Sequence, residues 1–191
     1  MNLQDGMTLY HGSYTPIETI DLAKCSAGKD FGRGFYLTSD YEQARKFIST
    51  SLKKAQQTGA VSEEQTHGFV SAFCFHMPDA PLQVCSFPTA DRQWLWFVSA
   101  NRRAGLAQQF ASRLDPALKT ADVVIGKVAN DATNPVITAY LGGLYGPLES
   151  QAAADTAISL LLPDRLKNQF CFLTERSVNC LEPLEVVRHE S

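Results

Sequence analysis

The chain carries its strongest structural signal in two segments, Leu9-Tyr10-His11-Gly12-Ser13 and Asp30-Phe31-Gly32-Arg33-Gly34-Phe35-Tyr36-Leu37-Thr38. In the first, a predicted strand over Met7–Tyr10 ends in a histidine, a glycine and a polar turn. In the second, two glycines flank a basic residue, and a short aromatic strand follows over Gly34–Thr38. Because its last glycine opens a strand rather than a helix, the second segment is not the phosphate loop of a dinucleotide-binding fold.

Outward from these segments, short strands and helices follow one another without regular alternation. Asp40 and Asp91 are predicted to cap helices, and Gln43 completes a capping box with Asp40. Ala44, Phe47, Ile48, Leu52 and Ala55 are expected to form the apolar face of the first of these helices, which Gly59 ends. Further strands are predicted at Phe73–Met77, Leu82–Phe87, Asp122–Gly126, Gln169–Leu173 and Leu184–Val187, and helices at Pro135–Leu141, Ser150–Leu162 and, as a short turn, near Glu175–Leu181. This order favours an α+β fold with a split, mixed sheet, in one domain spanning residues 1–191.

Composition excludes several classes of protein. The chain has 191 residues, of which 45% are hydrophobic and 19% charged, so it can bury a full core and is not intrinsically disordered as a whole. Its formal net charge of −3 argues against a protein that coats DNA, which needs a basic surface to displace counterions. Local contact with nucleic acid by an enzyme stays open.

Targeting and redox signals point to the cytoplasm. No apolar run approaches the ~20 residues that span a bilayer, and residues 1–6 do not resemble a signal peptide. The chain has five cysteines, which is an odd number, and no two of them form a Cys-x-x-Cys pair. Neither a disulfide framework nor a zinc ribbon is therefore indicated. We therefore expect a cytoplasmic protein, or one delivered into the cytoplasm of a target cell, without membrane association.

Taken together, the two opening segments resemble the NAD-binding core of the ADP-ribosyltransferase superfamily. The likeness is to the branch of diphtheria-toxin-like proteins and poly(ADP-ribose) polymerases, whose signature is a His-Tyr-Glu triad. There the first strand ends in His-Gly, as in His11-Gly12, and the second begins with Gly-Lys-Gly-hydrophobic-Tyr, as in Gly32-Arg33-Gly34-Phe35-Tyr36. With later segments, the chain is similar to a bacterial family of unknown function in that clan, often met beside small antitoxin-like genes.

The resemblance implies a role for each matching residue. His11 would bond the adenosine-ribose hydroxyls, the Gly12 backbone would take the nicotinamide amide, and Tyr36 would stack on the nicotinamide ring. Arg33 would meet the pyrophosphate or remain a solvated loop charge. The other expected NAD-binding residues are Ser13, Gly34 and Thr38. For the hydroxyls of Ser13 and Thr38, a purely structural role explains the residue at least as well as contact with NAD.

The third triad position departs from the pattern, because Gln169 in Asn168-Gln169-Phe170-Cys171-Phe172 stands where the glutamate would be. An amide can keep a hydrogen bond to the reacting ribose but supplies neither charge nor base. The expected function is therefore mono-ADP-ribosyl transfer from NAD to a protein or nucleic acid, with release of nicotinamide. The resemblance also implies that the protein is the toxin of a toxin–antitoxin pair, with a small antitoxin protein as its partner. The alternatives are an NAD glycohydrolase and a catalytically silent NAD- or nucleotide-binding module.

Other candidate residues have weaker support. Cys74 and His76 share a strand face, but nothing completes a metal site, so no metal is expected. Glu175 could offer a carboxylate in place of Gln169, although capping the next helical turn explains it better. The basic cluster at 101–103 is either a solvated helix end or a target-binding rim, and Asn130-Asp131 is either a turn or a substrate contact.

Overall fold

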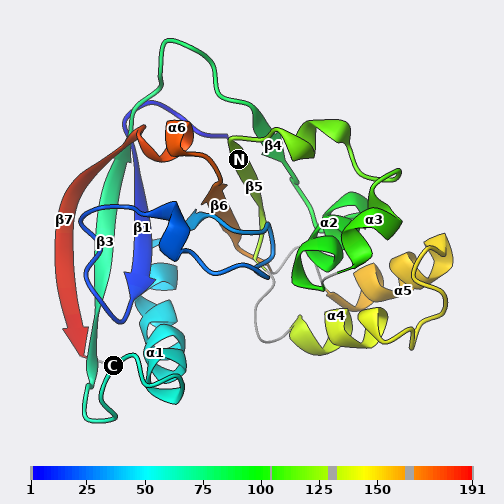
Figure 1. Ribbon diagram of the computed structural model, residues 1–191, viewed down its shortest axis with the longest axis horizontal. Helices are drawn as coiled ribbons and strands as arrows, with labels where there is room; N and C mark the ends of the chain where they lie inside the picture. The colour runs from blue at the N-terminus through cyan, green and yellow to red at the C-terminus, as the bar shows by residue number, and fades with distance from the viewer. Residues whose placement is uncertain (1, 104, 129–132, 162–165, 191) are drawn as a thin grey trace.

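The computed structural model describes residues 2–103, 105–128, 133–161 and 166–190 of the chain, which form seven strands in two sheets (Figure 1). The first sheet is antiparallel, with the strands in the order β1 (Met7–Ser13), β3 (His67–Phe75) and β7 (Leu181–Glu190). The second is mixed, with the order β2 (Phe35–Leu37), β6 (Asn168–Phe172), β5 (Val123–Lys127) and β4 (Val84–Ser86); β4 and β5 pair in parallel. The α+β class and the mixed pairing predicted from sequence are confirmed.

In the described part of the chain, an isolated bridge between Tyr10 of β1 and Thr38, directly after β2, brings the two sheets together. The Tyr10 N–H donates to the Thr38 carbonyl at 2.7 Å, and the Thr38 N–H donates to the Tyr10 carbonyl at 3.0 Å. The two segments run antiparallel, so the end of β1 lies alongside the start of β2. His11 and Gly12, directly after the bridge, therefore border the split between the sheets.

Helices pack on both sheets. The helices of the described residues are α1 (Tyr41–Gln57), α2 (Arg92–Arg102), α3 (Leu106–Phe110), α4 (Asn134–Leu141), α5 (Gln151–Leu161) and α6 (Glu175–Val178). Helix α1 packs on the first sheet, whereas α2, α4 and α5 gather on the far side of the second (Figure 1). No helix in the described part of the chain is long and apolar enough to cross a membrane.

Strand alternation divides the apolar side chains between separate clusters. One cluster is shared by the two sheets, where Phe75 of β3 lies with its ring centroid 6.1 Å from that of Phe172 in β6. Phe35 and Leu37 of β2 also face this cluster, whereas Tyr36 between them faces the larger cluster built around Trp94 and α2. The polar site described below is thus set among aromatic side chains on the α2 side of β2 and β6.

Helix α1 begins and ends as predicted. The Asp40 carboxylate accepts from the Gln43 N–H at 3.0 Å, and Gly59 adopts a positive φ of 70° just past the last turn. The predicted capping box does not form. Its second bond would join the Gln43 side chain to the Asp40 N–H, but the Gln43 side chain accepts from the Thr38 hydroxyl instead. The expectation that Phe47 is a core residue is wrong, because it is 45% exposed, on the helical stripe of Lys54 rather than that of the buried Ile48.

Boundaries differ most in the last strand and the smaller helices. The predicted strand at Leu184–Val187 is the middle of the ten-residue β7, which is held along its whole length by β3. Helix α3 and two 3-10 turns, at Leu22–Lys24 and Pro116–Lys119, had no clear signal in the sequence. The two 3-10 turns bury no residue and are each capped locally, by the Asp21 and Asp115 side chains, whereas α3 buries Leu106 and Phe110.

Candidate functional site

His11 lies in the split between the sheets. Its Nδ1 is 2.8 Å from the Tyr36 carbonyl oxygen, and its ring lies 4.7 Å from the Phe35 ring, centroid to centroid. Burial lowers the pKa of the His11 imidazole, and the positive charge of Lys29 lowers it further. The imidazole is therefore neutral at physiological pH, with the proton on Nδ1 donated to the carbonyl, and its Nε2 remains an acceptor suited to a hydroxyl.

Gly12 combines close packing with an outward-facing backbone. A Cβ there would lie 1.9 Å from the Ala44 carbonyl oxygen of α1, so no larger residue fits without moving the helix. The backbone N–H and C=O of Tyr10 bond Thr38 rather than β3. Because alternate residues of a strand direct these groups to the same side, those of Gly12 point the same way. The Gly12 peptide groups therefore point toward the split, beyond the bridge.

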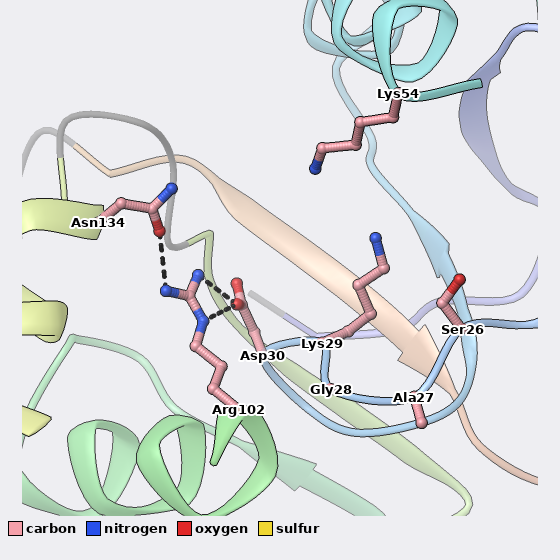
Figure 2. Close-up of a pocket in the computed structure, with 8 residues that line it drawn as sticks. All are labelled: Ser26, Ala27, Gly28, Lys29, Asp30, Lys54, Arg102 and Asn134. Carbon is pink, nitrogen blue, oxygen red and sulfur yellow. Dashed lines mark hydrogen bonds and ion pairs between the residues drawn. The ribbon is translucent and has the colours of Figure 1, made fainter. Parts of the chain in front are cut away.

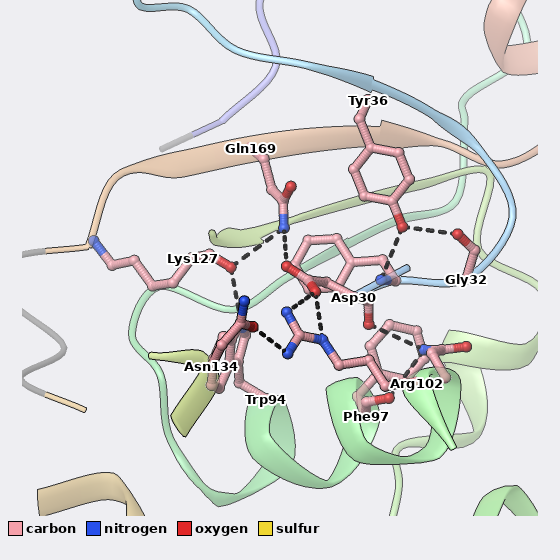
Figure 3. A network of polar contacts seen from close by, with 11 residues as sticks. Asp30, Gly32, Tyr36, Trp94, Phe97, Arg102, Lys127, Asn134 and Gln169 are labelled. Carbon is pink, nitrogen blue, oxygen red and sulfur yellow. Dashed lines mark hydrogen bonds and ion pairs between the residues drawn. The ribbon is translucent and has the colours of Figure 1, made fainter. Parts of the chain in front are cut away.

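Tyr36 ties the loop before β2 to the sheet. Its hydroxyl donates to the Gly32 carbonyl at 2.8 Å and accepts from the Phe31 N–H at 2.9 Å (Figure 3). Burial raises the pKa of this hydroxyl far above its ordinary value, so it stays protonated and continues to donate. The ring stacks against that of Phe31, with centroids 6.4 Å apart. Tyr36 thus shapes the Gly-Arg-Gly turn in addition to any contact it makes with a ligand.

Gln169 lies on the same face of the second sheet as Tyr36. The Tyr36 position pairs with Cys171, two residues further along β6, so Gln169 is its diagonal neighbour. The amide is almost completely buried, at 8% exposure, and its Nε2 donates to Asp30 Oδ2 at 3.1 Å and to the Lys127 carbonyl at 3.4 Å (Figure 3). The amide nitrogen is therefore directed inward, into a polar network.

Asp30 is the centre of this network. Arg102 of α2 pairs with its Oδ1 through Nε at 2.8 Å and Nη2 at 2.6 Å, and also donates to Asn134 of α4 at 2.8 Å. Asn101 donates to the Asp30 carbonyl at 3.3 Å. In the basic cluster at 101–103, Arg102 is a half-buried partner of Asp30 rather than a solvated helix end, and the exposed Arg103 donates to the Leu141 carbonyl; a role in target binding stays a prediction.

Asp30 and Asn134 were not singled out from sequence. Asp30 stands at the head of the segment that carries Gly32 and Tyr36, but a loop aspartate gives no sign that it will be buried. Its 9% exposure, with a charged partner from a distant helix, is the signal that identifies it here.

A cleft of about 480 Å³ opens beside Asp30 (Figure 2). It is lined by the loop residues 26–30, Lys54 of α1, Arg102 and Asn134. The ammonium groups of Lys29 and Lys54 both project into the opening in Figure 2, and neither forms a hydrogen bond or ion pair with another residue in the described part of the chain. Burial lowers the pKa of Lys29, and the charge of Lys54 lowers it further. The cleft is therefore electropositive, and of its lining residues Lys29 lowers the pKa of His11 by its charge and Asp30 accepts from Gln169.

The other predicted binding residues make contacts within the fold. Gly34 is needed because a Cβ there would lie 2.6 Å from the Cys171 sulfur. Thr38 is buried, and its hydroxyl accepts from the Asp40 N–H at the start of α1. The buried Ser13 hydroxyl accepts from the Thr15 N–H, and the exposed Arg33 donates to the Ala23 carbonyl. Arg33 does not line the cleft, and its contact with a pyrophosphate stays a prediction.

Two further candidates lie at the surface. Glu175 is exposed in the first turn of α6, where Thr174 rather than Glu175 is the cap. His76 pairs with Glu182 at 2.7 Å on the surface. Among the described residues, no three side chains of the types His, Cys, Asp and Glu gather closely enough to hold a metal ion. Asn130 and Asp131 lie outside the described residues.

The fold and this site define an α+β protein with a buried polar network beside an electropositive cleft. Residues 7–182 match the family model described as Protein of unknown function (DUF3990), and the chain belongs to that family. No curated protein matches the chain. The family description assigns no activity, so function has to be argued from the site.

Proposed function

We propose that this protein is a mono-ADP-ribosyltransferase that transfers one ADP-ribose from NAD to a macromolecular acceptor and releases nicotinamide. The observation that carries the proposal is the position of His11-Gly12 at the split between two sheets, with the His11 imidazole bonded to the backbone of Tyr36 at 2.8 Å. This position supports the proposal, because the resemblance carried by the His-Gly and Gly-Arg-Gly-Phe-Tyr segments implies an NAD site at such a split.

The local chemistry fits nicotinamide and ribose. A primary carboxamide both donates and accepts, and the outward-facing N–H and C=O of Gly12 offer the complementary pair. The neutral His11 imidazole, with its Nε2 acceptor, suits a ribose hydroxyl. Tyr36, whose ring stacks on Phe31 on one side, would take the nicotinamide ring on the other, as the resemblance implies.

The cleft fits the diphosphate of NAD. Lys29 and Lys54 project into the same opening, and the surrounding carboxylate, Asp30, is already paired with Arg102. A diphosphate between the two ammonium groups would relieve the repulsion by Lys54 that, after burial, lowers the pKa of Lys29. We therefore assign the diphosphate contact to Lys29 and Lys54 in preference to Arg33.

In the proposed reaction the bond between nicotinamide nitrogen and ribose C1′ breaks, and its electron pair leaves with nicotinamide. A nucleophilic oxygen or nitrogen of the acceptor bonds to C1′ and loses its proton to solvent. The acceptor is a protein or a nucleic acid. Gln169 orients the reacting ribose by a hydrogen bond, and its lack of charge limits the protein to single transfer rather than chain elongation.

The uncharged Gln169 also favours a second candidate, a silent module that binds NAD without consuming it. The test is incubation of purified protein with NAD labelled in the adenosine part, with and without cell lysate, and separate measurement of nicotinamide, labelled protein and labelled nucleic acid. We expect nicotinamide release and transfer of label, both abolished by His11→Ala and retained by His76→Ala, which changes an exposed histidine. Binding without release would establish the silent module, and release without labelled macromolecules would establish a glycohydrolase.

The resemblance further suggests a toxin with a small antitoxin partner. Overexpression in bacteria should slow growth, and His11→Ala should relieve this effect at equal soluble expression. Equal toxicity of the parent and the variant would contradict this part of the proposal.

A further inference from the structure

The hydrogen bonds of Gln169 determine which way its amide points. Its two inward partners, the Asp30 carboxylate and the Lys127 carbonyl, can only accept. The amide must therefore present its NH₂ group to them and turn its oxygen away from both. Figure 3 shows the Gln169 nitrogen directed at Asp30.

The same partners explain why glutamine rather than glutamate occupies this position. A carboxylate at residue 169 would bring an acceptor to about the 3.1 Å separation that now joins Gln169 Nε2 to Asp30 Oδ2. Two carboxylates that close repel each other, and neither would have a proton to share with the Lys127 carbonyl. An acidic group is present beside residue 169, and it is supplied by the loop before β2 rather than by β6.

Arg102 keeps this acidic group in place. It contacts Asp30 Oδ1 through two nitrogens, which leaves Oδ2 to accept from Gln169. Arg102 is in turn anchored by Asn134 at 2.8 Å, and the Asp30 backbone is held by Asn101. The carboxylate therefore has one orientation, with one oxygen committed to α2 and the other to β6.

We propose that Asp30 is the positioning residue of this site: it holds the Gln169 amide with its oxygen outward, as the hydrogen-bond acceptor for a hydroxyl of the reacting ribose. Asp30 acts through Gln169 and does not itself touch the substrate. An amide free to rotate would present its NH₂ group to the ribose in part of the population, and a hydroxyl held in that way is misoriented for reaction. The inference deepens the proposed transferase function and rests on it for the identity of the ribose.

The experiment compares four proteins: the parent, Asp30→Asn, Gln169→Glu and the double variant with both changes. The double variant keeps one carboxylate and one amide but exchanges their places, so the asparagine at position 30 can donate to the glutamate at position 169. Lys53→Ala, an exposed change on α1, is the control for handling and assay variation. Single-turnover release of nicotinamide, NAD affinity and the midpoint of thermal unfolding are measured for each.

We expect Gln169→Glu to slow nicotinamide release by about 10²-fold with little change in NAD affinity, since orientation rather than binding is lost. Asp30→Asn should slow it by a smaller factor. The double variant should recover to within about tenfold of the parent, because the two positions are coupled. The unfolding midpoint should show the same pattern, falling in Gln169→Glu and rising again in the double variant.

The outcomes separate this inference from the proposed function. If the parent releases nicotinamide but the double variant is no faster than Gln169→Glu, the positioning role of Asp30 is overturned and the transferase function stands. If the parent neither binds NAD nor releases nicotinamide, the function is overturned. In that case the unfolding midpoint still tests whether Asp30 orients the amide. Recovery of the midpoint in the double variant would support this role, and additive effects of the two changes on the midpoint would refute it.

Discussion

Removing the hydroxyl of Tyr36 tests whether this tyrosine holds the loop before β2. In Tyr36→Phe the ring remains, but the Gly32 carbonyl loses its donor and the Phe31 N–H loses its acceptor. Phe31 is only 2% exposed, so water cannot easily replace the lost partner. Leaving a buried group unsatisfied costs about 1–3 kcal/mol, and the second bond adds about 1 kcal/mol, so the free energy of unfolding should fall by about 2–4 kcal/mol.

Urea unfolding measured by tryptophan fluorescence provides the assay. Tyr10→Phe is the matched control, because Tyr10 lies on the neighbouring strand and its hydroxyl bonds no other residue in the described ranges. Tyr36→Phe should also lower NAD affinity, since Lys29, the proposed diphosphate contact, is bonded through its carbonyl to the Gly32 N–H of the loosened turn. A loss of stability below about 0.5 kcal/mol, no greater than for an ordinary surface change, would show that the two hydrogen bonds do not anchor the loop.

Three further predictions address the split and the cleft. Gly12→Ala should lower the free energy of unfolding by about 1–3 kcal/mol, because its Cβ would meet the Ala44 carbonyl at 1.9 Å; unchanged urea unfolding would refute the packing of β1 on α1. Burial lowers the pKa of folded His11 below the 6.5 of the unfolded chain, so the free energy of unfolding should fall as the pH drops below 6.5. His11→Asn should flatten this pH dependence. If the free energy of unfolding changes equally with pH in the parent and the variant, His11 is not the group responsible. Lys54→Ala should raise the KM for NAD about fivefold, equivalent to about 1 kcal/mol, whereas Lys53→Ala should not; equal effects would remove Lys54 from the diphosphate site.

Local signals in the sequence predicted the elements that depend on local bonds. Asp40 and Asp91 cap α1 and α2 as expected, because a short side-chain acceptor directly before an amphipathic run satisfies the free N–H groups of the first turn. The run around Trp94 is helical as predicted, but its six consecutive residues 94–99 are all buried, so tertiary packing encloses the helix on every side there. Phe47 shows the limit of this reasoning, since periodicity identifies an apolar stripe but not its width.

The candidate site was predictable only in part. The sequence drew attention to His11, Gly12, Tyr36 and Gln169, and the structure brings His11 against the Tyr36 backbone and places Tyr36 and Gln169 on one sheet face. It did not indicate that the Tyr36 hydroxyl is used to hold its own loop, or that the Thr38 hydroxyl is used at the start of α1. Side-chain type defines which hydrogen bonds are possible, and only the surroundings decide which of them form.

The sequence by itself determined the α+β class, the caps and most of the strands, because these follow from hydrophobic period and from bonds between residues close in the chain. Only the tertiary structure decided that Asp30 faces Gln169, 139 positions away, and that Arg102 comes from a third element to pair with it. Contacts between such distant residues leave no trace in local pattern, since they depend on how β2, β6 and α2 pack together. The polar network at the candidate site is made almost entirely of contacts of this kind.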